Sequence, residues 1–511
     1  MKSPTVHTIS ISEQESHLWE NLFYILLAAV LMWRLCFAFI SPLDLSPDES
    51  YYWDWSRHPE MGYYSKPPMI AWINLFSTGF FGSITGVVRL PSVFFGTLSL
   101  FFIFALTRRM FDEKTAFFAA ALSMASPGNV ALSYIMTIDA PLVFFWSLSL
   151  YLFYMAVEKN KPSLWIGLGV ASGFGVLSKQ MMLVFSVIMI IYLFLDKNKK
   201  PLLKNAWPYL SIVLSASFLA PVLYWNMKTD WITLKHTAHH FESHGQGGFY
   251  FLKTMGDFLG TQLGIITPVT WFLLAVLTVI SVWHFRKLNG RCRYLYLFGS
   301  FSLFFFMAMS IRQRINANWP AVFYIAGIIF LSAWHSGYID FMPRLRKWVK
   351  PGLIVGAVLT VLTYALVFAF DVFIPLSPKL DPTFRLKGWH EMGEAISGIM
   401  ENEAASTFLI ASNRENVSAM AFYVKGNPRV YKWTNATHFI DSQYDLWKGP
   451  HDRIGDNAIL VQDKNEKPHP ELVAAFKKMT FVKTIRVKAG LSGFREFDIY
   501  KGEKLINWPR N

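Results

Sequence analysis

Long apolar runs separated by short polar segments fill the first three quarters of the chain. Runs of about 18 or more residues with few charges are typical of membrane-spanning helices. Segment 68–86 is apolar as well, but it begins with Pro68 and carries Gly and Ser toward its end, so we interpret it as helical and interfacial; if it crosses, the number of spans rises from eleven to twelve. The predicted spans are 21–41, 89–107, 115–133, 140–157, 163–178, 180–195, 208–225, 261–283, 295–311, 319–335 and 352–375.

The pattern changes after residue 376. The segments TFLIA (407–411) and AILVQ (458–462) predict buried strands, and residues 416–424 and 470–479 predict helices. This tail is long enough to bury a small core of its own. We therefore expect a polytopic α-helical membrane protein with about 11–12 transmembrane helices. Its parts are an N-terminal tail (1–20), a transmembrane domain (21–375) that contains a first outer loop at 42–88, and a soluble α/β domain (376–511).

The composition supports a membrane protein. Hydrophobic residues make up 53% of the 511 positions and charged residues only 16%, whereas charged residues approach about 25% in soluble chains. The net charge of +14 does not indicate a nucleic-acid partner, because most Lys and Arg fall in short loops between spans, where they set orientation. The positive-inside rule places those loops and the N-terminal tail in the cytoplasm. The first outer loop and the C-terminal domain then share the opposite, outer face.

The first outer loop concentrates reactive side chains. Residues 42–68, PLDLSPDESYYWDWSRHPEMGYYSKPP, carry the adjacent acids Asp48 and Glu49, a belt of Tyr and Trp, and Lys66 before two prolines. Ionisable groups at a membrane boundary indicate a functional site. The alternative interpretation is an interfacial aromatic belt with solvated acids.

Further charges are predicted at the same outer face. Asp139, Lys179, Arg312 and Arg314 lie at or beside outer helix ends, and Arg34 lies about two turns inside the first span. A carboxylate can act as general base toward a hydroxyl or amine, and cations stabilise a departing phosphate. This set indicates transfer from a donor with an anionic leaving group. The alternative for each single charge at a helix end is that its side chain simply extends to water. For Arg34, a contact with a lipid headgroup and a structural role are both open.

The segment 226–260 is predicted to be a loop rich in histidine. Four histidines and one acid could bind a divalent metal; they are His236, His239, His240, His244 and Glu242. The alternative is a polar loop over a cavity, with the glycines of GQGGF (245–249) acting as hinges that let it exclude water.

Together these motifs resemble the membrane glycosyltransferases of the GT-C class. The similarity is greatest to the bacterial group related to protein O-mannosyltransferases and lipid A aminoarabinose transferases, and it extends over nearly the whole chain. The matching segments are DESYYWDWS (48–56), GYYSKPPMIAW (62–72), RLPSVFFG (89–96), TIDAPLVFFW (137–146), LSKQ (177–180), NWPAVFY (318–324), LKGWHEMG (386–393) and QYDLWKGP (443–450).

The resemblance implies roles for individual residues. Asp48 would be the general base of a single inverting displacement, with Glu49 assisting acceptor or loop positioning. Lys66 would contact the phosphate of a polyprenyl (undecaprenyl) phosphate sugar donor. Further donor-phosphate candidates are Arg34, Lys179, Arg312 and Arg314, and candidates for the acceptor site or cavity are Asp139, Tyr51, Tyr63 and Tyr64.

The resemblance also implies an acceptor, a membrane location and a set of partners. The acceptor would be lipid A or another envelope glycolipid, on the periplasmic face of the bacterial inner membrane; a protein hydroxyl is the alternative. We expect a monomer that contacts donor, acceptor and membrane lipids, with no nucleic acid and no required cofactor, a divalent metal remaining open.

Two other classes compete with an enzyme. A secondary transporter would show related halves with corresponding broken spans, which this chain lacks at the sequence level. An anchored binding module would not need eleven spans, and it leaves Asp48 and Lys66 unexplained.

Overall fold

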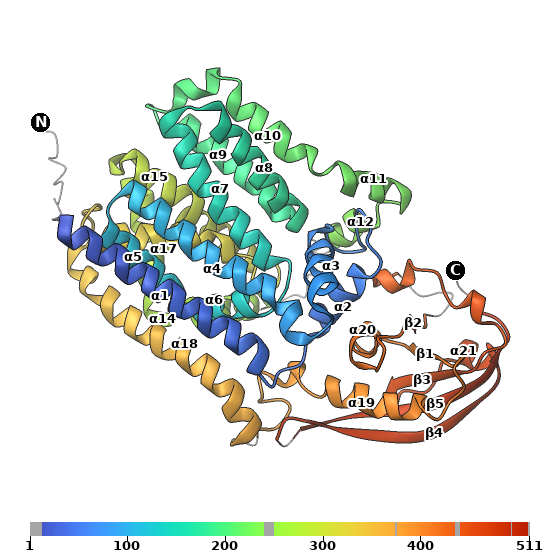
Figure 1. The fold of residues 1–511 in the computed structure, drawn as a ribbon. Coiled ribbons are helices and arrows are strands. Elements are labelled where there is room, and N and C mark those ends of the chain that lie inside the picture. Colours follow the sequence, from blue (N-terminus) through green and yellow to red (C-terminus); the bar gives the residue numbers. More distant parts are fainter. Residues whose placement is uncertain (1–12, 240–249, 374–375, 435–439, 492, 509–511) are drawn as a thin grey trace, which may run out of the picture. The chain divides into compact units, whose positions relative to one another are not determined.

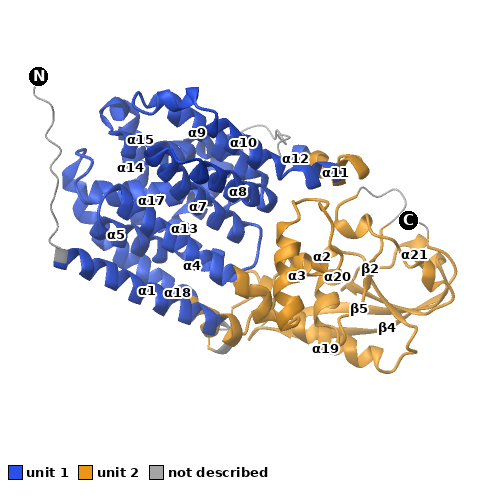
Figure 2. Cartoon of the chain, turned by 45° about the horizontal axis from the view of Figure 1, so that its top comes forward, with its two compact units in different colours: residues 1–37, 92–224, 237–363 blue, residues 38–91, 225–236, 364–511 orange. Residues whose placement is uncertain are grey.

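The structure is a computed structural model that describes residues 13–239, 250–373, 376–434, 440–491 and 493–508. Contacts divide the chain into two compact units (Figure 2). Unit 1 comprises residues 1–37, 92–224 and 237–363, and unit 2 comprises residues 38–91, 225–236 and 364–511. The contacts thus group the first outer loop with the C-terminal tail rather than with the apolar helices.

Unit 1 is built from apolar helices (Figure 1). It contains most of α1 (Glu13–Ile40) and of α18 (Val349–Val372), both of which end in unit 2. The others are α4 (Thr85–Met110), α5 (Glu113–Met124), α6 (Pro127–Tyr134), α7 (Asp139–Lys159), α8 (Pro162–Ser178), α9 (Leu183–Leu195), α10 (Trp207–Ser217), α11 (Ala220–Lys228), α13 (Tyr250–Ile266), α14 (Pro268–His284), α15 (Gly290–Leu295), α16 (Phe301–Ser310) and α17 (Ala321–His335).

The predicted spans coincide with helices. Within the described ranges, seven helical stretches are long and apolar enough to cross a membrane, and an eighth is formed if α5 and α6, bent by 72°, count as one span. Four shorter apolar helices accompany them, so a total of eleven or twelve requires shorter helices to cross as well. One predicted boundary is wrong. The span expected at 261–283 starts at Pro268, because proline cannot continue α13 past Thr267.

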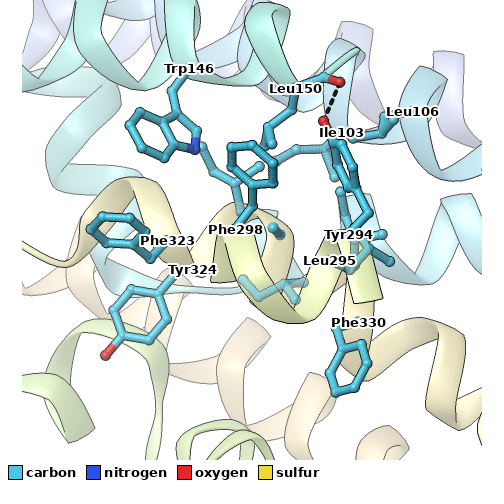
Figure 3. Packing of buried hydrophobic residues seen from close by; sticks show 14 of the residues in the cluster. Ile103, Leu106, Trp146, Leu150, Tyr294, Leu295, Phe298, Phe323, Tyr324 and Phe330 are labelled. Carbon is cyan, nitrogen blue, oxygen red and sulfur yellow. Dashed lines mark hydrogen bonds between the residues drawn. The ribbon is translucent and has the colours of Figure 1, made fainter. Parts of the chain in front are cut away.

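Aromatic packing holds the core of unit 1 together (Figure 3). The Trp146 ring lies 5.2 Å from that of Phe323, and the buried Tyr294 hydroxyl donates to the Leu150 carbonyl at 2.7 Å. Gly299, in a single π-helical turn, allows a close approach. A Cβ there would lie 2.3 Å from the Gly327 nitrogen of α17, so only glycine fits.

Unit 2 combines helices with a five-stranded sheet. Its helices are α2 (Pro47–Ser56), α3 (Met69–Phe81), the start of α12 (Ile232–His239), α19 (Trp389–Met400), α20 (Arg414–Tyr423) and α21 (Pro470–Ala474). The strands are β1 (Phe408–Ala411), β2 (Val430–Lys432), β3 (Ala458–Asp463), β4 (Phe476–Ala489) and β5 (Gly493–Leu505). In the order β2-β1-β3-β5-β4, the first three are parallel and β5 is antiparallel to both β3 and β4.

Strands β1 and β3 and helix α20 confirm the predictions for the tail. The helix predicted at 470–479 is wrong beyond Ala474, because Phe476 begins the long edge strand β4. Pairing with β5 and burial of alternate residues such as Ile485 and Val487 outweigh the local helical pattern. The loop predicted at 226–260 is also wrong in part, since α12 and α13 occupy much of its described length.

Candidate active site

Asp48 and Glu49 occupy the first turn of α2. The Ser46 hydroxyl accepts from the Glu49 N–H at 3.2 Å, and Glu49 Oε2 accepts from the Ser46 N–H at 2.8 Å. This capping box, with Pro47 at the first helical position, starts the helix at this point. Because successive helical positions point about 100° apart, the two acids enter different surroundings.

Glu49 is completely buried against Arg89. The Arg89 guanidinium donates to Glu49 Oε1 at 3.0 Å and to Oε2 at 3.2 Å, and both side chains have no exposed surface. Arg89 also donates to the carbonyls of Leu43 (3.0 Å) and Asp44 (2.6 Å). Glu49 of the loop is thus paired with Arg89, and its expected role in acceptor or loop positioning stays a prediction. Arg89 was not singled out from the sequence, although its motif RLPSVFFG was.

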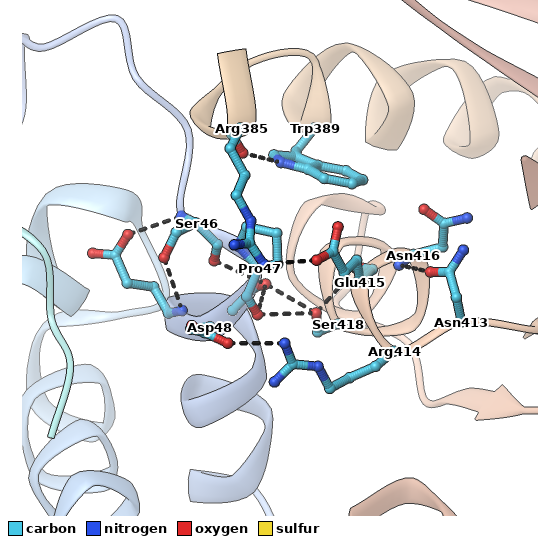
Figure 4. A network of polar contacts seen from close by, with 12 residues as sticks. Ser46, Pro47, Asp48, Arg385, Trp389, Asn413, Arg414, Glu415, Asn416 and Ser418 are labelled. Carbon is cyan, nitrogen blue, oxygen red and sulfur yellow. Dashed lines mark hydrogen bonds and ion pairs between the residues drawn. The ribbon is translucent and has the colours of Figure 1, made fainter. Parts of the chain in front are cut away.

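Asp48 is the accessible acid of the pair. Its side chain is 41% exposed, and its Oδ1 lies 2.9 Å from Nη2 of Arg414, the first residue of α20 (Figure 4). The Arg414 guanidinium carbon also lies 4.8 Å from the centre of the Tyr51 ring, which limits the orientations it can take. A residue of the tail thus holds the carboxylate while leaving it open to a substrate.

Asp44 caps a helix of the tail. Its Oδ2 accepts from the N–H groups of Trp389 (2.8 Å) and His390 (3.3 Å) at the start of α19, where the N-cap residue is Gly388 and offers no side chain. Burial raises the pKa of Asp44 to about 6, although the two backbone hydrogen bonds act in the opposite direction. No local sequence pattern links residues so far apart, so this contact could not be predicted.

Tyr51 and Tyr64 are buried against the tail segment QYDLWKGP. The Gln443 N–H donates to the Tyr51 hydroxyl, and the Tyr64 N–H donates to Gln443 Oε1 at 2.7 Å. The Tyr64 hydroxyl donates to the Ile440 carbonyl at 3.0 Å. These contacts give both tyrosines a packing role; their predicted part in acceptor binding stays a prediction.

Tyr63 and Lys66 lie in the turn before α3. The buried Tyr63 ring stacks on Trp55 with centroids 4.4 Å apart, and its hydroxyl donates to the Trp55 carbonyl at 3.1 Å. The Lys66 carbonyl accepts from the Tyr63 N–H at 3.2 Å, and the residue is half-buried. The predicted contact of Lys66 with a donor phosphate remains a prediction.

The histidine-rich segment is described only in part. Nδ1 of His236 lies 3.1 Å from the Tyr64 hydroxyl. Among the residues with described side chains, no group of three or more His, Cys, Asp or Glu is placed to hold a metal ion. His240, Glu242 and His244 lie outside the described residues, as does the side chain of His239.

A second polar cluster lies in unit 1. Asp139 begins α7, Lys179 follows α8, and Asn318 precedes α17. Lys179 Nζ lies 2.8 Å from Asp139 Oδ1, and the Asn318 amide donates to Asp139 Oδ2 at 2.6 Å. The motifs TIDAP, LSKQ and NWP, which the sequence placed separately, thus meet at one point.

An apolar cavity of about 390 Å³ starts beside this cluster. Its lining includes Met181, two positions after Lys179, and Trp319, next to Asn318. Apart from Ser302, the rest of its wall is apolar, and it comes from α9, the π-helical turn before α16, α16 and α17. An apolar cavity close to a charged group suits a ligand with a hydrocarbon chain and a polar head.

The predicted arginines do not join this cluster. Arg34 is buried in α1 and donates to Asn129 of α6 and to Thr97 of α4; its expected contact with a headgroup or donor phosphate stays a prediction. Arg312 and Arg314 are exposed between α16 and α17. Their contact with a donor phosphate stays a prediction.

Comparison with known proteins shows consistent matches. Residues 65–225 match the family model "Dolichyl-phosphate-mannose-protein mannosyltransferase". The lipid A galacturonosyltransferase RgtD of Rhizobium johnstonii is 23% identical over 408 residues, which cover 78% of this chain and 82% of that protein. The undecaprenyl phosphate-α-4-amino-4-deoxy-L-arabinose arabinosyl transferase 2 of Pseudomonas fluorescens is 31% identical over 133 residues, 25% of this chain and 23% of that one.

A solved structure shares the fold. The crystal structure of ArnT from Cupriavidus metallidurans in the apo state superposes with a TM-score of 0.61 at 17% identity. The match covers 94% of this chain and 97% of that one. The apolar helices and the small C-terminal sheet domain therefore form one recognised architecture, as the sequence predicted.

Proposed function

We propose that this chain, a multi-pass membrane glycosyltransferase of the GT-C class, transfers a sugar from a polyprenyl-phosphate donor to lipid A or a related envelope glycolipid. The activities named for two relatives support this proposal. One acts on lipid A, and the other takes its sugar from undecaprenyl phosphate. Their sugars differ, so the sugar moved by this chain is left open.

The observation that carries the proposal is the Asp139–Lys179–Asn318 cluster beside the apolar cavity. A polyprenyl chain requires an apolar wall, and its phosphate requires a cation at the end of that wall. The Lys179 ammonium has three N–H donors, and Asp139 takes one of them at 2.8 Å. Asp139 and Asn318 would hold Lys179 in position, and its other donors would bind the phosphate. Lys66 is the second candidate for that contact.

Asp48 would act as the general base. It would accept the proton of an acceptor hydroxyl as that oxygen forms its bond to the anomeric carbon, which inverts the configuration. The bond from the anomeric carbon to the phosphate oxygen breaks, and its electron pair leaves with the phosphate. Because phosphate is already a good leaving group, a second acid is not needed. Arg414 would orient Asp48, and Glu49 would keep the loop in place through Arg89.

The acceptor would be reached from the periplasmic side of a bacterial inner membrane. The basic residues cluster in one set of short loops, which the positive-inside rule assigns to the cytoplasm. The first outer loop and the C-terminal sheet domain would then lie on the periplasmic side.

Mass spectrometry of envelope lipids tests the proposal. Lipids from a strain that lacks the gene are compared with those from the same strain that carries the wild-type gene on a plasmid. We expect a lipid species that loses the mass of one sugar on deletion and regains it on complementation. Identical lipids in both strains would contradict the proposal. A mass increment on protein instead would favour the second candidate, a protein O-glycosyltransferase, which the name of the matching family model supports.

A further inference from the structure

The three parallel strands of unit 2 end side by side. Ala411 of β1 pairs with Lys432 of β2 and with Val461 of β3. The residues that follow these three, namely Ser412, Trp433 and Gln462, therefore form a row at the carboxyl edge of the sheet. The chain leaves β1 toward β2 on one side and later returns to β3 on the other. In open α/β sheets, ligands bind outside the carboxyl ends of the strands at such a reversal.

A hollow of about 400 Å³ lies at this edge. It falls within the range of roughly 300–1,000 Å³ that is typical of small-molecule clefts. The row Ser412, Trp433 and Gln462 forms part of its wall. The remaining wall residues, all polar, are Lys432, Thr434, Asp441, Glu466, Lys467 and His469.

Two buried polar atoms in this wall lack a hydrogen-bond partner among the described residues. They are Nε1 of Trp433 and Oε1 of Gln462, and each residue is only 4% exposed. The other end of the Gln462 amide is fixed, since Nε2 donates to Ser412 Oγ at 2.8 Å. One end of the amide therefore stays unsatisfied whichever way it is turned. A buried polar group left this way costs about 1–3 kcal/mol, and a ligand in the hollow recovers that cost only if the side chain turns its buried atom toward it.

We infer that this hollow, the carboxyl-edge site, binds a saccharide. Of the two unpartnered atoms, Nε1 of Trp433 is a donor and Oε1 of Gln462 is an acceptor. A hydroxyl group can satisfy both. The rest of the wall offers a hydroxyl (Thr434), carboxylates (Asp441 and Glu466), ammonium groups (Lys432 and Lys467) and an imidazole (His469). These charges nearly balance, which favours a neutral polyhydroxylated ligand over a phosphate or a carboxylate.

The carboxyl-edge site consists of tail residues alone, so its occupancy does not depend on the transfer reaction. The same chemistry would bind a free saccharide or the saccharide portion of an envelope glycoconjugate. In the second case the tail would hold a glycan-bearing molecule on the enzyme.

Saturation-transfer difference NMR tests the inference on the full-length protein in a detergent without a sugar headgroup. One set of probes comprises the methyl glycosides of glucose, galactose and glucosamine together with diacetylchitobiose. The other probe is the oligosaccharide released from lipopolysaccharide by mild acid. Binding by the first set alone indicates a free saccharide, and binding by the released oligosaccharide alone indicates an envelope glycan. If no probe of either kind binds, the inference is overturned.

Substitutions locate the binding. We expect Gln462→Leu and Trp433→Phe to weaken the apparent affinity at least tenfold, as loss of a buried hydrogen bond predicts. Trp283→Phe, at a 77% exposed tryptophan of α14, is the matched control and should bind normally. If the buried substitutions prevent folding, Lys467→Ala on the exposed rim should still weaken binding severalfold. Unchanged affinity in the pocket variants overturns the inference. Loss of binding in Asp48→Asn also overturns it, because the saccharide would then bind at the transfer site.

Discussion

Nη2 of Arg414 lies 2.9 Å from Oδ1 of Asp48, which joins the C-terminal tail to the acid proposed as general base. The contact belongs to a larger set within unit 2. Ser418 of the same helix bonds to Ser50 at 3.1 Å, and Asp44 caps α19. The tail is thus part of the structure that positions the first outer loop, so an intact tail should be required for activity.

Replacement of Asp48 by Asn should abolish transfer while leaving the fold intact. Asparagine keeps the size of the side chain but cannot accept the acceptor's proton, and general-base catalysis contributes about 10²–10⁴-fold. The rate is measured with purified enzyme and a synthetic polyprenyl-phosphate sugar donor. Asp452→Asn, at an exposed aspartate of the tail, is the matched control. Full activity of Asp48→Asn would rule out the general-base role.

Replacement of Arg414 by Met should lower kcat by about tenfold to hundredfold, because misplacing a catalytic group by about 1 Å has an effect of that size. Arg414→Lys should recover only part of the rate, since lysine keeps the charge but not the planar fork. The KM for the donor and the unfolding temperature should barely change, because a partly exposed ion pair adds little stability. A lowered unfolding temperature with normal kcat would instead show a purely structural contact.

Replacement of Glu49 by Ala should destabilise the protein by about 3–5 kcal/mol, because it leaves the buried Arg89 guanidinium without its carboxylate. Thermal unfolding in detergent measures the effect. Glu401→Ala breaks an ion pair with Lys425 whose side chains are 61% and 80% exposed, and it should leave the unfolding temperature nearly unchanged. Equal effects of the two substitutions would contradict a stabilising role for the buried ion pair of Glu49 with Arg89.

Replacement of Lys179 or Lys66 by Ala should raise the KM for the polyprenyl-phosphate donor about tenfold to hundredfold. A hydrogen bond to a charged group is worth about 1.5–3 kcal/mol, and about 1.4 kcal/mol corresponds to a factor of ten. Initial rates at varied donor concentration give the measurement. Lys235→Ala, at a side chain that is 55% exposed, should behave as wild type. An unchanged donor KM in either variant would remove that lysine from the donor site.

Replacement of Asp44 by Asn should remove a pH dependence of stability between about pH 4 and 6. Burial raises the pKa of Asp44 from 3.8 to about 6 in the folded protein, so the folded state holds the proton more tightly than the unfolded state does. Its contribution to stability is therefore full below pH 4 and is lost as pH rises through 6, by up to about 3 kcal/mol. Asparagine still accepts the Trp389 N–H and does not titrate.

Unfolding temperatures of wild type and Asp44→Asn, measured at pH 4.5 and 7.5 in the same detergent, check this prediction. The variant should gain stability relative to wild type at the higher pH. If the difference between the two proteins is the same at both pH values, Asp44 does not titrate as described.

The sequence by itself determined the helices and several elements of the tail. Apolar runs long enough to cross a bilayer must form helices, because lipid offers no other partner for the backbone. The predicted spans accordingly fall on helices, although the span at 115–133 bends by 72° between α5 and α6 and the span at 261–283 begins at Pro268. Strands β1 and β3 were predictable because each contains a short, buried apolar run. The helical pattern of residues 470–479 gave a wrong prediction from Phe476 onward, because pairing with β5 determines the conformation there.

Tertiary structure alone decided how the charged residues are used. Asp48 and Glu49 are neighbours in the chain, but the Asp48 side chain is 41% exposed and the Glu49 side chain is completely buried against Arg89. Asp139, Lys179 and Asn318 come from separate motifs and meet only because α7, α8 and α17 bring them together. Burial and hydrogen bonding depend on residues distant in sequence, and local hydrophobic patterns carry no record of those partners.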